Sequence, residues 1–356
     1  MAGNDDLHQA KKAKKDEFYT QLQDIENELK NYKEFFKGKT VFCNCDDPYE
    51  SDFFKYFAMN FNHLGLKKLI CTSYTGSPIV GEEFSDLPLF RSLNSKKAYK
   101  VEITEVYDEN GDGAINMTDV DLLLKNMKNK MELLKGDGDF RSQECIELLK
   151  ESDIVVTNPP FSLFSEFLEQ LIKFKKDFVI IGNTNALSYK EVFQLFQKDG
   201  IRTGYTKFNV GMFFRVPDYW EKYTKIENGV KMARVSTSCW LTSLPVKKHN
   251  DELTCYKEYN PQDYPRYDNY DAINIDKYTD IPKDYYGVMG VPITFLDKYN
   301  PNQFEIIDIN PHFFNIIAQG LPKPKQLTLH SVGRKDPYAR ILIKRKDSNE
   351  NRTPQN

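Results

Sequence analysis

Apolar runs and amphipathic segments alternate along the first two hundred residues of the chain. Short apolar runs between polar turns predict buried strands, and apolar positions three and four apart predict helices with one apolar face. These patterns predict strands that begin near residues 40, 67, 154 and 177, and helices at 51–64, 143–150, 161–174 and 189–197. Strands that alternate with helices build a parallel sheet covered by those helices. The predicted fold class is therefore α/β, with a Rossmann-like sheet that has helices on both faces.

The pattern changes on either side of this region. Before it, apolar residues at helical spacing predict an N-terminal helix within residues 1–38. After residue 200, the strand-like pieces at 210–216 and 239–244 are candidates to complete the sheet, and residues 251–346 show little periodicity. We therefore divide the chain into a helix at 1–38, a sheet domain at 39–250 that can also take strands from later in the chain, a C-terminal region at 251–346 and a mobile tail at 347–356.

The composition is that of a soluble protein with a sizeable core. The chain has 356 residues, of which 40% are hydrophobic, and no apolar run approaches the roughly 20 residues that cross a bilayer. The N-terminus is polar and lacks the apolar centre of a signal peptide, so we expect a cytoplasmic protein that contacts no membrane. The six cysteines include no CxxC pair and no Cys/His cluster, so we expect free thiols and no metal site.

Charge is distributed unevenly, although the formal net charge is only −3. Residues 1–200 contain 26 Lys and Arg against 34 Asp and Glu, whereas residues 201–356 contain 23 against 18. Contact with phosphate needs only a local basic face, so a basic C-terminal half is compatible with a nucleic-acid partner without demonstrating one.

The stretch Asn-Pro-Pro-Phe at 158–161 follows the predicted strand at 154–156 directly. Prolines cannot donate to a sheet ladder, so the strand must end there and leave a rigid polar tip at its carboxyl end, where open α/β sheets bind ligands. The Asn158 side chain and the Pro159 carbonyl can both accept hydrogen bonds from an amino group, Pro160 stiffens the turn, and Phe161 can stack on a flat ring. The alternative is a Pro-Pro turn that only ends the strand.

Asn-Pro-Pro-Phe resembles the catalytic motif of amino-methyltransferases that use S-adenosylmethionine. Three longer stretches, 136–142, 153–164 and 264–297, resemble the EcoRI-type adenine-specific DNA methyltransferases in particular. The resemblance covers most of the chain, from about Lys39 to about Lys346. It implies an enzyme that transfers a methyl group from S-adenosylmethionine to N6 of an adenine flipped out of double-stranded DNA.

The resemblance also suggests where the cofactor binds. The polar turn after the first strand lacks the usual glycines and offers instead Asn44, Asp46 and Asp47. The carboxylates of the two Asp residues suit the ammonium group of S-adenosylmethionine. In the resembling enzymes an Asp-Phe pair contacts the cofactor adenine, which assigns this role to Asp139 and Phe140. Ordinary capping and helix-entry turns are the structural alternatives at both places.

The resemblance further implies that 39–250 is the catalytic domain and that 251–346 belongs to the target-recognition region. It also suggests a restriction-modification system, with a cognate endonuclease that acts on the same site without forming a stable complex. Two alternative functions stay open. The same pocket could serve another planar amino group, such as cytosine N4, RNA adenine or a protein amide. The acidic loop at 108–119 has the ligand spacing of a calcium loop and could instead mark a calcium-binding or scaffolding module.

Overall fold

The computed structural model describes residues 18–48, 50–75, 97–126, 131–206, 208, 210–218, 220–323, 326–337 and 339–346. By its internal contacts the chain forms two compact units. Unit 1 comprises Met1–Ala186 and Gly204–Leu244, and unit 2 comprises Leu187–Thr203 and Pro245–Asn356. This division differs from the predicted boundary at 250, because the segment before residue 204 belongs to the second unit. The predicted tail at 347–356 lies outside the described residues.

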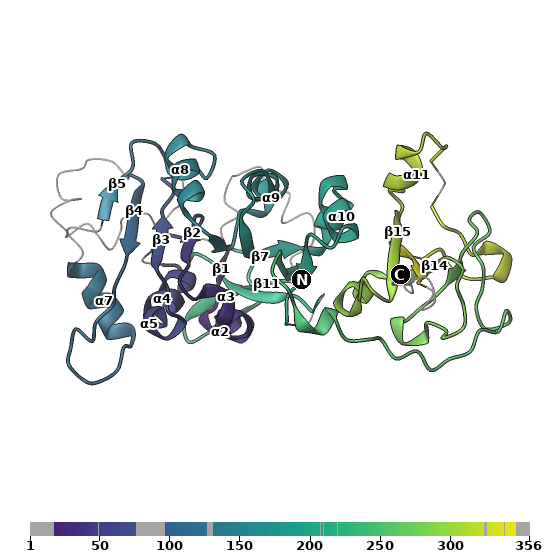
Figure 1. Cartoon of the computed structure of the whole chain (residues 1–356), viewed down its shortest axis with the longest axis horizontal. Helices are drawn as coiled ribbons and strands as arrows, with labels where there is room; N and C mark the ends of the chain where they lie inside the picture. Colours follow the sequence, from purple (N-terminus) through teal and green to yellow (C-terminus); the bar gives the residue numbers. More distant parts are fainter. Residues whose placement is uncertain are drawn as a thin grey trace, which may run out of the picture. The chain divides into compact units, whose positions relative to one another are not determined.

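A mixed sheet forms the centre of unit 1, with the strand order β5-β4-β3-β2-β6-β7-β12 (Figure 1). Its middle strands run parallel: β3 (Lys68–Thr72), β2 (Thr40–Cys43), β6 (Ile154–Thr157) and β7 (Asp177–Asn183). Each outer strand runs antiparallel to its inner neighbour: β4 (Tyr99–Ile103), β5 (Met131–Leu133) and β12 (Ser238–Thr242). All four residues of both β2 and β6 are buried, as expected for central strands covered on both faces.

Helices cover both faces of this sheet, as Figure 1 shows, and confirm the predicted α/β class. One face carries α8 (Gln143–Glu151) and α9 (Phe164–Lys173), which follows the short 3₁₀ turn η2 (Phe161–Leu163). The other face carries α4 (Asp52–Met59) and α5 (Phe61–Leu64). Helix α4 begins where the sequence indicates, because the Ser51 hydroxyl accepts a hydrogen bond from the Phe53 amide at 3.1 Å. A further helix, α7 (Met117–Asn126), follows the acidic loop.

The N-terminal helix differs from its prediction. Within the described residues it begins only at Leu22, as α2 (Leu22–Leu29), and continues through the 3₁₀ turn η1 (Lys30–Tyr32) into α3 (Lys33–Phe36). Among the described residues before it, Tyr19–Thr20 form strand β1. This strand pairs with Arg215 and Phe214, almost two hundred residues later. A local apolar period cannot reveal such a distant pairing.

A second sheet in unit 1 has the strand order β1-β9-β11-β10, with β9 (Met212–Arg215), β10 (Lys225–Glu227) and β11 (Val230–Val235), and all its neighbouring strands are antiparallel. The two candidates for completing the main sheet therefore behave differently. The piece at 239–244 joins it as β12, where Trp240 pairs with Ile181. The piece at 210–216 does not, because β9 lies in the second sheet.

Unit 2 contains its own small sheet, in the order β13-β14-β16-β15. Its strands are β13 (Ile273–Asn274), β14 (Met289–Pro292), β15 (Phe304–Asn310) and β16 (Arg340–Arg345), and its helices include α10 (Lys190–Gln197) and α11 (Phe314–Ala318). An apolar cluster beside the sheet contains Tyr267, Ala272, Phe313, Leu327, Leu329 and Leu342. The aperiodic sequence at 251–346 thus folds around a core, although most of it is irregular. No helix in the described part of the chain is long and apolar enough to cross a membrane.

Candidate active site

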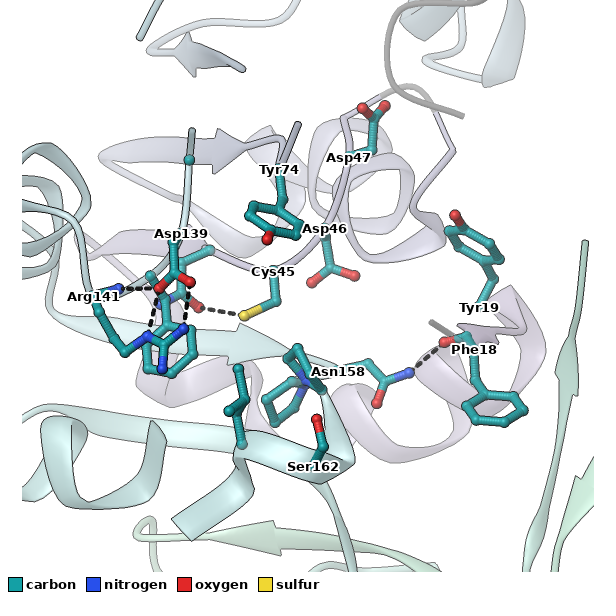
Figure 2. Close-up of a pocket in the computed structure, with 16 residues that line it drawn as sticks. Phe18, Tyr19, Cys45, Asp46, Asp47, Tyr74, Asp139, Arg141, Asn158 and Ser162 are labelled. Carbon is teal, nitrogen blue, oxygen red and sulfur yellow. Dashed lines mark hydrogen bonds and ion pairs between the residues drawn. The ribbon is translucent and has the colours of Figure 1, made fainter. Parts of the chain in front are cut away.

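The polar turns after β2 and β6 lie side by side, because these two parallel strands are neighbours and end at the same edge of the sheet. A pocket with a volume of about 380 Å³ opens at this edge. Of the site residues predicted from sequence, the pocket is lined by Asn44, Asp46, Asp47, Asp139, Phe140, Asn158, Pro159 and Pro160, but not by Phe161. Figure 2 shows Asp46 and Asn158 facing the same space, with Asp139 and Arg141 on one side and Phe18 and Tyr19 on the other.

Asp46 places a buried carboxyl group in this pocket. Its side chain accepts hydrogen bonds from the hydroxyl of Ser51, at 2.9 Å, and from the hydroxyl of Thr157 at the end of β6. Burial raises the pKa of Asp46 to about 7, and these hydroxyls together with the backbone N–H of Asn158 act in the opposite direction. Asp46 is therefore close to the midpoint of its titration at neutral pH, and a cation bound beside it would favour the ionised form.

Asn44 and Asp47 are buried on either side of Asp46. The Asn44 carbonyl accepts from the Thr72 hydroxyl at 3.3 Å, which connects the turn to the end of β3. The Asp47 carboxylate accepts from the Tyr99 hydroxyl at 2.9 and 3.0 Å. Hydrogen bonds from neighbouring strands thus fix a turn that has no glycine, and they leave Asp46 facing the space beside Asn158 (Figure 2).

The segment before α8 forms another wall of the pocket. Gly138 has φ +80°, and a Cβ there would lie 2.0 Å from the Ser73 carbonyl oxygen, so only glycine permits this approach to the end of β3. Phe140 is buried and packs edge-on against Phe167, with ring centroids 5.2 Å apart. The Asp139 carboxylate is paired with the Arg141 guanidinium at 2.7 Å. An adenine amino group could use Asp139 only by sharing this carboxylate with Arg141.

The Asn158 side chain has a fixed orientation. Its Nδ2 donates to the backbone carbonyl of Phe18, and a carbonyl can receive only a donor, so the amide oxygen must face the other way. This Oδ1 atom is buried and has no hydrogen-bond partner among the described residues. A buried acceptor without a partner costs free energy unless a donor arrives from outside the chain. The geometry thus leaves one acceptor for a ligand, at the motif residue that the sequence predicts to hold an amino group.

Phe161 does not line the pocket, contrary to the simplest form of its predicted role. Its ring stacks on Phe18, with centroids 6.0 Å apart and an interplanar angle of 27°, and meets Phe214 edge-on at 6.2 Å. Phe18 also contacts Trp220 edge-on at 5.6 Å. An aromatic cluster therefore holds the Phe18 segment against the motif. The stacking of Phe161 on a base remains a prediction.

Sequence reasoning did not assign eight of the residues that line the pocket, among them Phe18, Tyr19 and Arg141. Phe18 and Tyr19 reach it through the pairing of β1 with β9, and no local signal indicates that pairing. Arg141 also lines the pocket, and its guanidinium bridges Asp139 and Glu166. The spacing Asp139-Phe140-Arg141 contained a usable signal, because a cation two residues after a carboxylate in a turn can pair with it.

The acidic loop at 108–119 follows β4 and runs into the first residues of α7, so a strand precedes it in place of the helix that a calcium loop would need. Carboxylate oxygens of Asp108, Asp112 and Asp119 lie within 4.8 Å of one another. The Asp119 carboxylate accepts from the backbone amides of Asn116, Asn110 and Glu109, and these bonds hold its pKa below the usual range. The carboxylates thus already stabilise the turn, which accounts for the motif without an ion.

A family model described as adenine-specific methyltransferase EcoRI matches residues 6–346. The chain belongs to this family. It is 47% identical to the Type II methyltransferase M.EcoRI of Escherichia coli, over 97% of this chain and 98% of that protein. It is also 38% identical to M.MgeORF184P of Mycoplasma genitalium and 36% identical to M.MpnI of Mycoplasma pneumoniae, over 95% and 96% of this chain and 98% of each relative. No solved structure matches the chain significantly.

The resemblance inferred from the motifs is thereby confirmed. The protein is an enzyme, a site-specific adenine DNA methyltransferase of the restriction-modification type. The pocket built around Asn158 lies where the motif of such an enzyme predicts its active site, at the carboxyl edge of the parallel strands. Neither the family nor the relatives assign roles to individual side chains of this chain.

Proposed function

We propose that the pocket between the turns at 44–47 and 158–161 binds S-adenosylmethionine together with an adenine flipped out of duplex DNA, and that N6 of this adenine receives the methyl group. The observation that carries the proposal is the buried Oδ1 of Asn158, which has no partner among the described residues. An exocyclic amino group is the donor that such an acceptor lacks. A base in a duplex cannot reach an enclosed pocket, so it must leave the helix.

The donor set of the pocket suits this cofactor. The carboxylate of Asp46 can pair with an ammonium group, and the buried polar turn that contains Asn44 and Asp47 surrounds it. Gly138 lets this wall of the pocket approach the end of β3 closely, and Phe140 offers an apolar ring for an adenine. When bound, S-adenosylmethionine supplies the methyl group on an electrophilic sulfonium.

The residues of the motif act by positioning and by hydrogen bonding. The adenine amino group is a poor nucleophile because its lone pair is delocalised into the ring. Two acceptors, Asn158 Oδ1 and the Pro159 carbonyl, favour a tetrahedral nitrogen whose lone pair is available. The Pro160 carbonyl already accepts from the Leu163 amide at 3.0 Å, so it closes the turn and leaves this role to Pro159.

Phe161 is proposed to stack on the flipped base, as its position in the motif suggests. Since its ring now lies on Phe18, stacking requires the side chain to turn toward the pocket. Exchange of one aromatic partner for another has a small net cost, because stacked rings contribute only about 0.5–1.5 kcal/mol beyond the burial of their area. The cluster with Phe18 and Phe214 therefore permits this movement.

Residues 251–346 are proposed to belong to the target-recognition region. The paired activity of the system would be an endonuclease that recognises the same site, with no stable complex between the two proteins. The two enzymes would be linked only because both act on the same DNA sequence.

One labelling experiment tests the proposed reaction. The protein is incubated with methyl-labelled S-adenosylmethionine and plasmid DNA, and the modified nucleosides are separated. We expect the label in N6-methyladenine, with no change when a chelator is present. Label in N4-methylcytosine, or transfer to RNA or protein in parallel reactions but not to DNA, would replace the proposed acceptor. Loss of transfer with the chelator would instead favour a calcium-dependent function of the loop at 108–119.

A further inference from the structure

Positive charge in the C-terminal part of the chain is concentrated in a short stretch. Residues 321–346 contain eight Lys and Arg and one Asp, whereas residues 251–320 contain five Lys and Arg and twelve Asp and Glu. The end of this stretch is strand β16, whose middle residues are buried. Residues 330–336 are all exposed and carry Arg334 and Lys335. We call residues 326–337 the basic loop.

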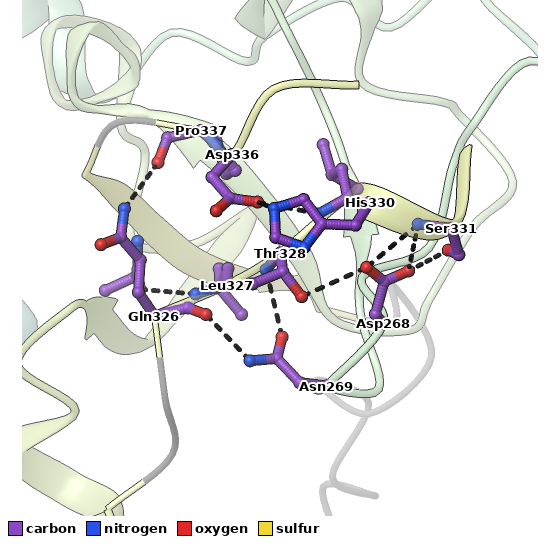
Figure 3. Close-up of polar contacts among 11 residues, drawn as sticks. Asp268, Asn269, Gln326, Leu327, Thr328, His330, Ser331, Asp336 and Pro337 are labelled. Atoms are coloured by element: carbon purple, nitrogen blue, oxygen red, sulfur yellow. Dashed lines mark hydrogen bonds and ion pairs between the residues drawn. The ribbon is translucent and has the colours of Figure 1, made fainter. Parts of the chain in front are cut away.

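Buried side chains and backbone hydrogen bonds fix the base of the basic loop. Leu327 and Leu329 are inserted into the apolar cluster of unit 2. Asn269 bridges the loop, because it accepts from the Thr328 amide at 3.1 Å and donates to the Gln326 carbonyl at 2.8 Å. Figure 3 shows these contacts converging from the segment at 268–269. The loop is thus anchored on its inner side.

Two carboxylates hold the outer part of the loop. Asp268 accepts from both the amide and the hydroxyl of Ser331 and from the Thr328 hydroxyl at 3.2 Å (Figure 3). Asp336 accepts from the Leu329 amide at 3.3 Å and pairs with the His330 ring at 3.1 Å. These contacts use the inward-facing polar groups and leave the outer face to solvent, where the His330 side chain is 72% exposed. The loop therefore presents a preformed surface.

Arg334 is held by a chain of hydrogen bonds that starts in the core. The buried Tyr267 donates its hydroxyl to Asn274 Oδ1 at 2.8 Å, and the buried Asn274 donates from Nδ2 to Asp276 at 2.8 Å. The other oxygen of Asp276 accepts from the Arg334 guanidinium at 3.0 Å. One side of the guanidinium is thus fixed. Its remaining N–H groups have a set direction on a side chain that is 47% exposed.

Space for a ligand lies beside this guanidinium. Arg334, Asp276 and Asn274 line a pocket of about 410 Å³ within unit 2, separate from the pocket at Asn158. Lys257 lies on the same pocket and pairs with Asp280 at 2.9 Å. Glu258 and Asp263 line it as well, so the two cations of the pocket lie among four carboxylates. A guanidinium that is fixed on one side and open on the other suits a planar ligand with two adjacent acceptors.

We propose that the basic loop contacts the DNA duplex, with Arg334 reading a guanine through its O6 and N7 atoms in the major groove and Lys335 contacting the phosphate backbone. Paired hydrogen bonds from Arg to guanine are the commonest specific contact with a base. The eight Lys and Arg within residues 321–346 complement the phosphate backbone of a duplex, and DNA is the substrate on which this family acts. The inference rests on the proposed function and assigns a part of target recognition to one side chain.

The test compares the sequence preference of variants. Sequencing of modified adenines in plasmid DNA first gives the site of the wild-type protein. Arg334→Ala and Arg334→Lys are then assayed on short duplexes that carry this site or a single replacement of each guanine. We expect wild-type discrimination of about 10- to 100-fold at one guanine. Both variants should lose the discrimination at this guanine and keep it at the other positions of the site. Arg334→Lys should bind DNA more tightly than Arg334→Ala, because it keeps the positive charge.

Lys335→Ala gives the second readout, by anisotropy of a labelled duplex at several salt concentrations. We expect weaker binding to every sequence. The slope of the logarithm of the binding constant against the logarithm of the salt concentration should fall by about one, as for the loss of one phosphate contact. Lys198→Ala is the matched control, since Lys198 is an exposed lysine of the same unit that lies outside the loop and does not line the pocket beside Arg334. It should bind DNA within about twofold of the wild type.

The outcomes separate this inference from the proposed function. Wild-type protein that methylates DNA while Arg334→Ala keeps full discrimination at each guanine, or a wild-type site without guanine, overturns the inference and leaves the function standing. Wild-type protein that methylates no duplex overturns the proposed function itself. Equal thermal unfolding of all variants shows that the changes act on recognition and not on folding.

Discussion

At the scale of single residues, the proposed chemistry rests mainly on Asn158 and Asp46, and each was recognisable from sequence for a physical reason. A polar residue held between a buried strand and two prolines has a fixed backbone and a free side chain. The orientation of the amide was not recognisable. It depends on the Phe18 carbonyl, which lies 140 residues away in the chain.

Cofactor binding should depend on pH through Asp46. Burial raises its pKa to about 7, and the ionised form is the one that attracts an ammonium group. The dissociation constant for S-adenosylmethionine should therefore increase up to about tenfold for each pH unit below 7 and become constant above about 8. Calorimetric titrations from pH 5.5 to 8.5 measure this. Asp46→Asn should bind weakly with no such slope; a slope that persists in this variant would contradict the assignment.

The same pKa shift has a consequence for the free protein. The folded pKa of Asp46 lies above its ordinary value of 3.8, so the folded state keeps a proton that the unfolded state releases. Asp46 therefore lowers the stability progressively as pH rises from about 4 to about 7. Asp46→Asn should remove this component, so that its unfolding free energy relative to the wild type increases over that range in urea titrations. A constant difference would mean that the carboxyl is not buried in solution.

At the scale of elements, the site depends on segments that come together from distant parts of the sequence. Strands β2 and β6 and helices α4, α8 and α9 follow from apolar periodicity, Ser caps and the Pro-Pro stop. The extended segment at 18–21 could not be predicted in this way, because its apolar spacing continues that of the helix after it. Its partner strand is β9, which lies far away in the sequence. Such pairings are set by tertiary packing, which overrides a local pattern.

The Phe18 segment should act as a positioning element for Asn158. In Phe18→Ala the ring contacts with Phe161, Phe214 and Trp220 are lost, so the Phe18 carbonyl no longer holds the amide in place. We expect the rate of methyl transfer in single turnover to fall about 10- to 100-fold. Cofactor affinity should change much less, since the carboxyl of Asp46 is held by other segments.

Phe18→Leu is the matched variant, because it keeps an apolar side chain in the cluster and should recover most of the rate. If Phe18→Ala weakens cofactor binding as strongly as it lowers the rate, the segment belongs to the cofactor site. If neither quantity changes, the contact with Asn158 has no role in the reaction.

The turn before α8 should tolerate no side chain at Gly138. A Cβ there would meet the Ser73 carbonyl oxygen at 2.0 Å, and the backbone has φ +80°. Gly138→Ala should lower the stability by about 1–3 kcal/mol and weaken cofactor binding, as measured by thermal unfolding and calorimetry. Gly136→Ala is the control, since a Cβ at that position meets nothing closer than 3.5 Å. Equal effects of both changes would mean that the close approach to Ser73 is unimportant.

At the scale of the whole molecule, the sequence predicted an α/β protein of this family, and the structure and the family match confirm both. The C-terminal region was less predictable, because its irregular segments are held by side-chain networks such as those around Asp268 and Asn274. Hydrogen bonds of this kind leave no period in the sequence. The functional division of the chain, with recognition assigned to 251–346, stays a prediction.

Single-turnover methyl transfer by Asn158→Ala tests most directly the role proposed for the unpaired oxygen of Asn158. We predict that the rate of N6-adenine methylation falls by at least about 10²-fold, since one acceptor at the reacting nitrogen is lost. The dissociation constant for S-adenosylmethionine, measured by calorimetry on the same preparation, should stay within about threefold of the wild-type value. A variant that methylates at the wild-type rate, or that loses cofactor binding and rate together, would contradict the role assigned to the unpaired oxygen of Asn158.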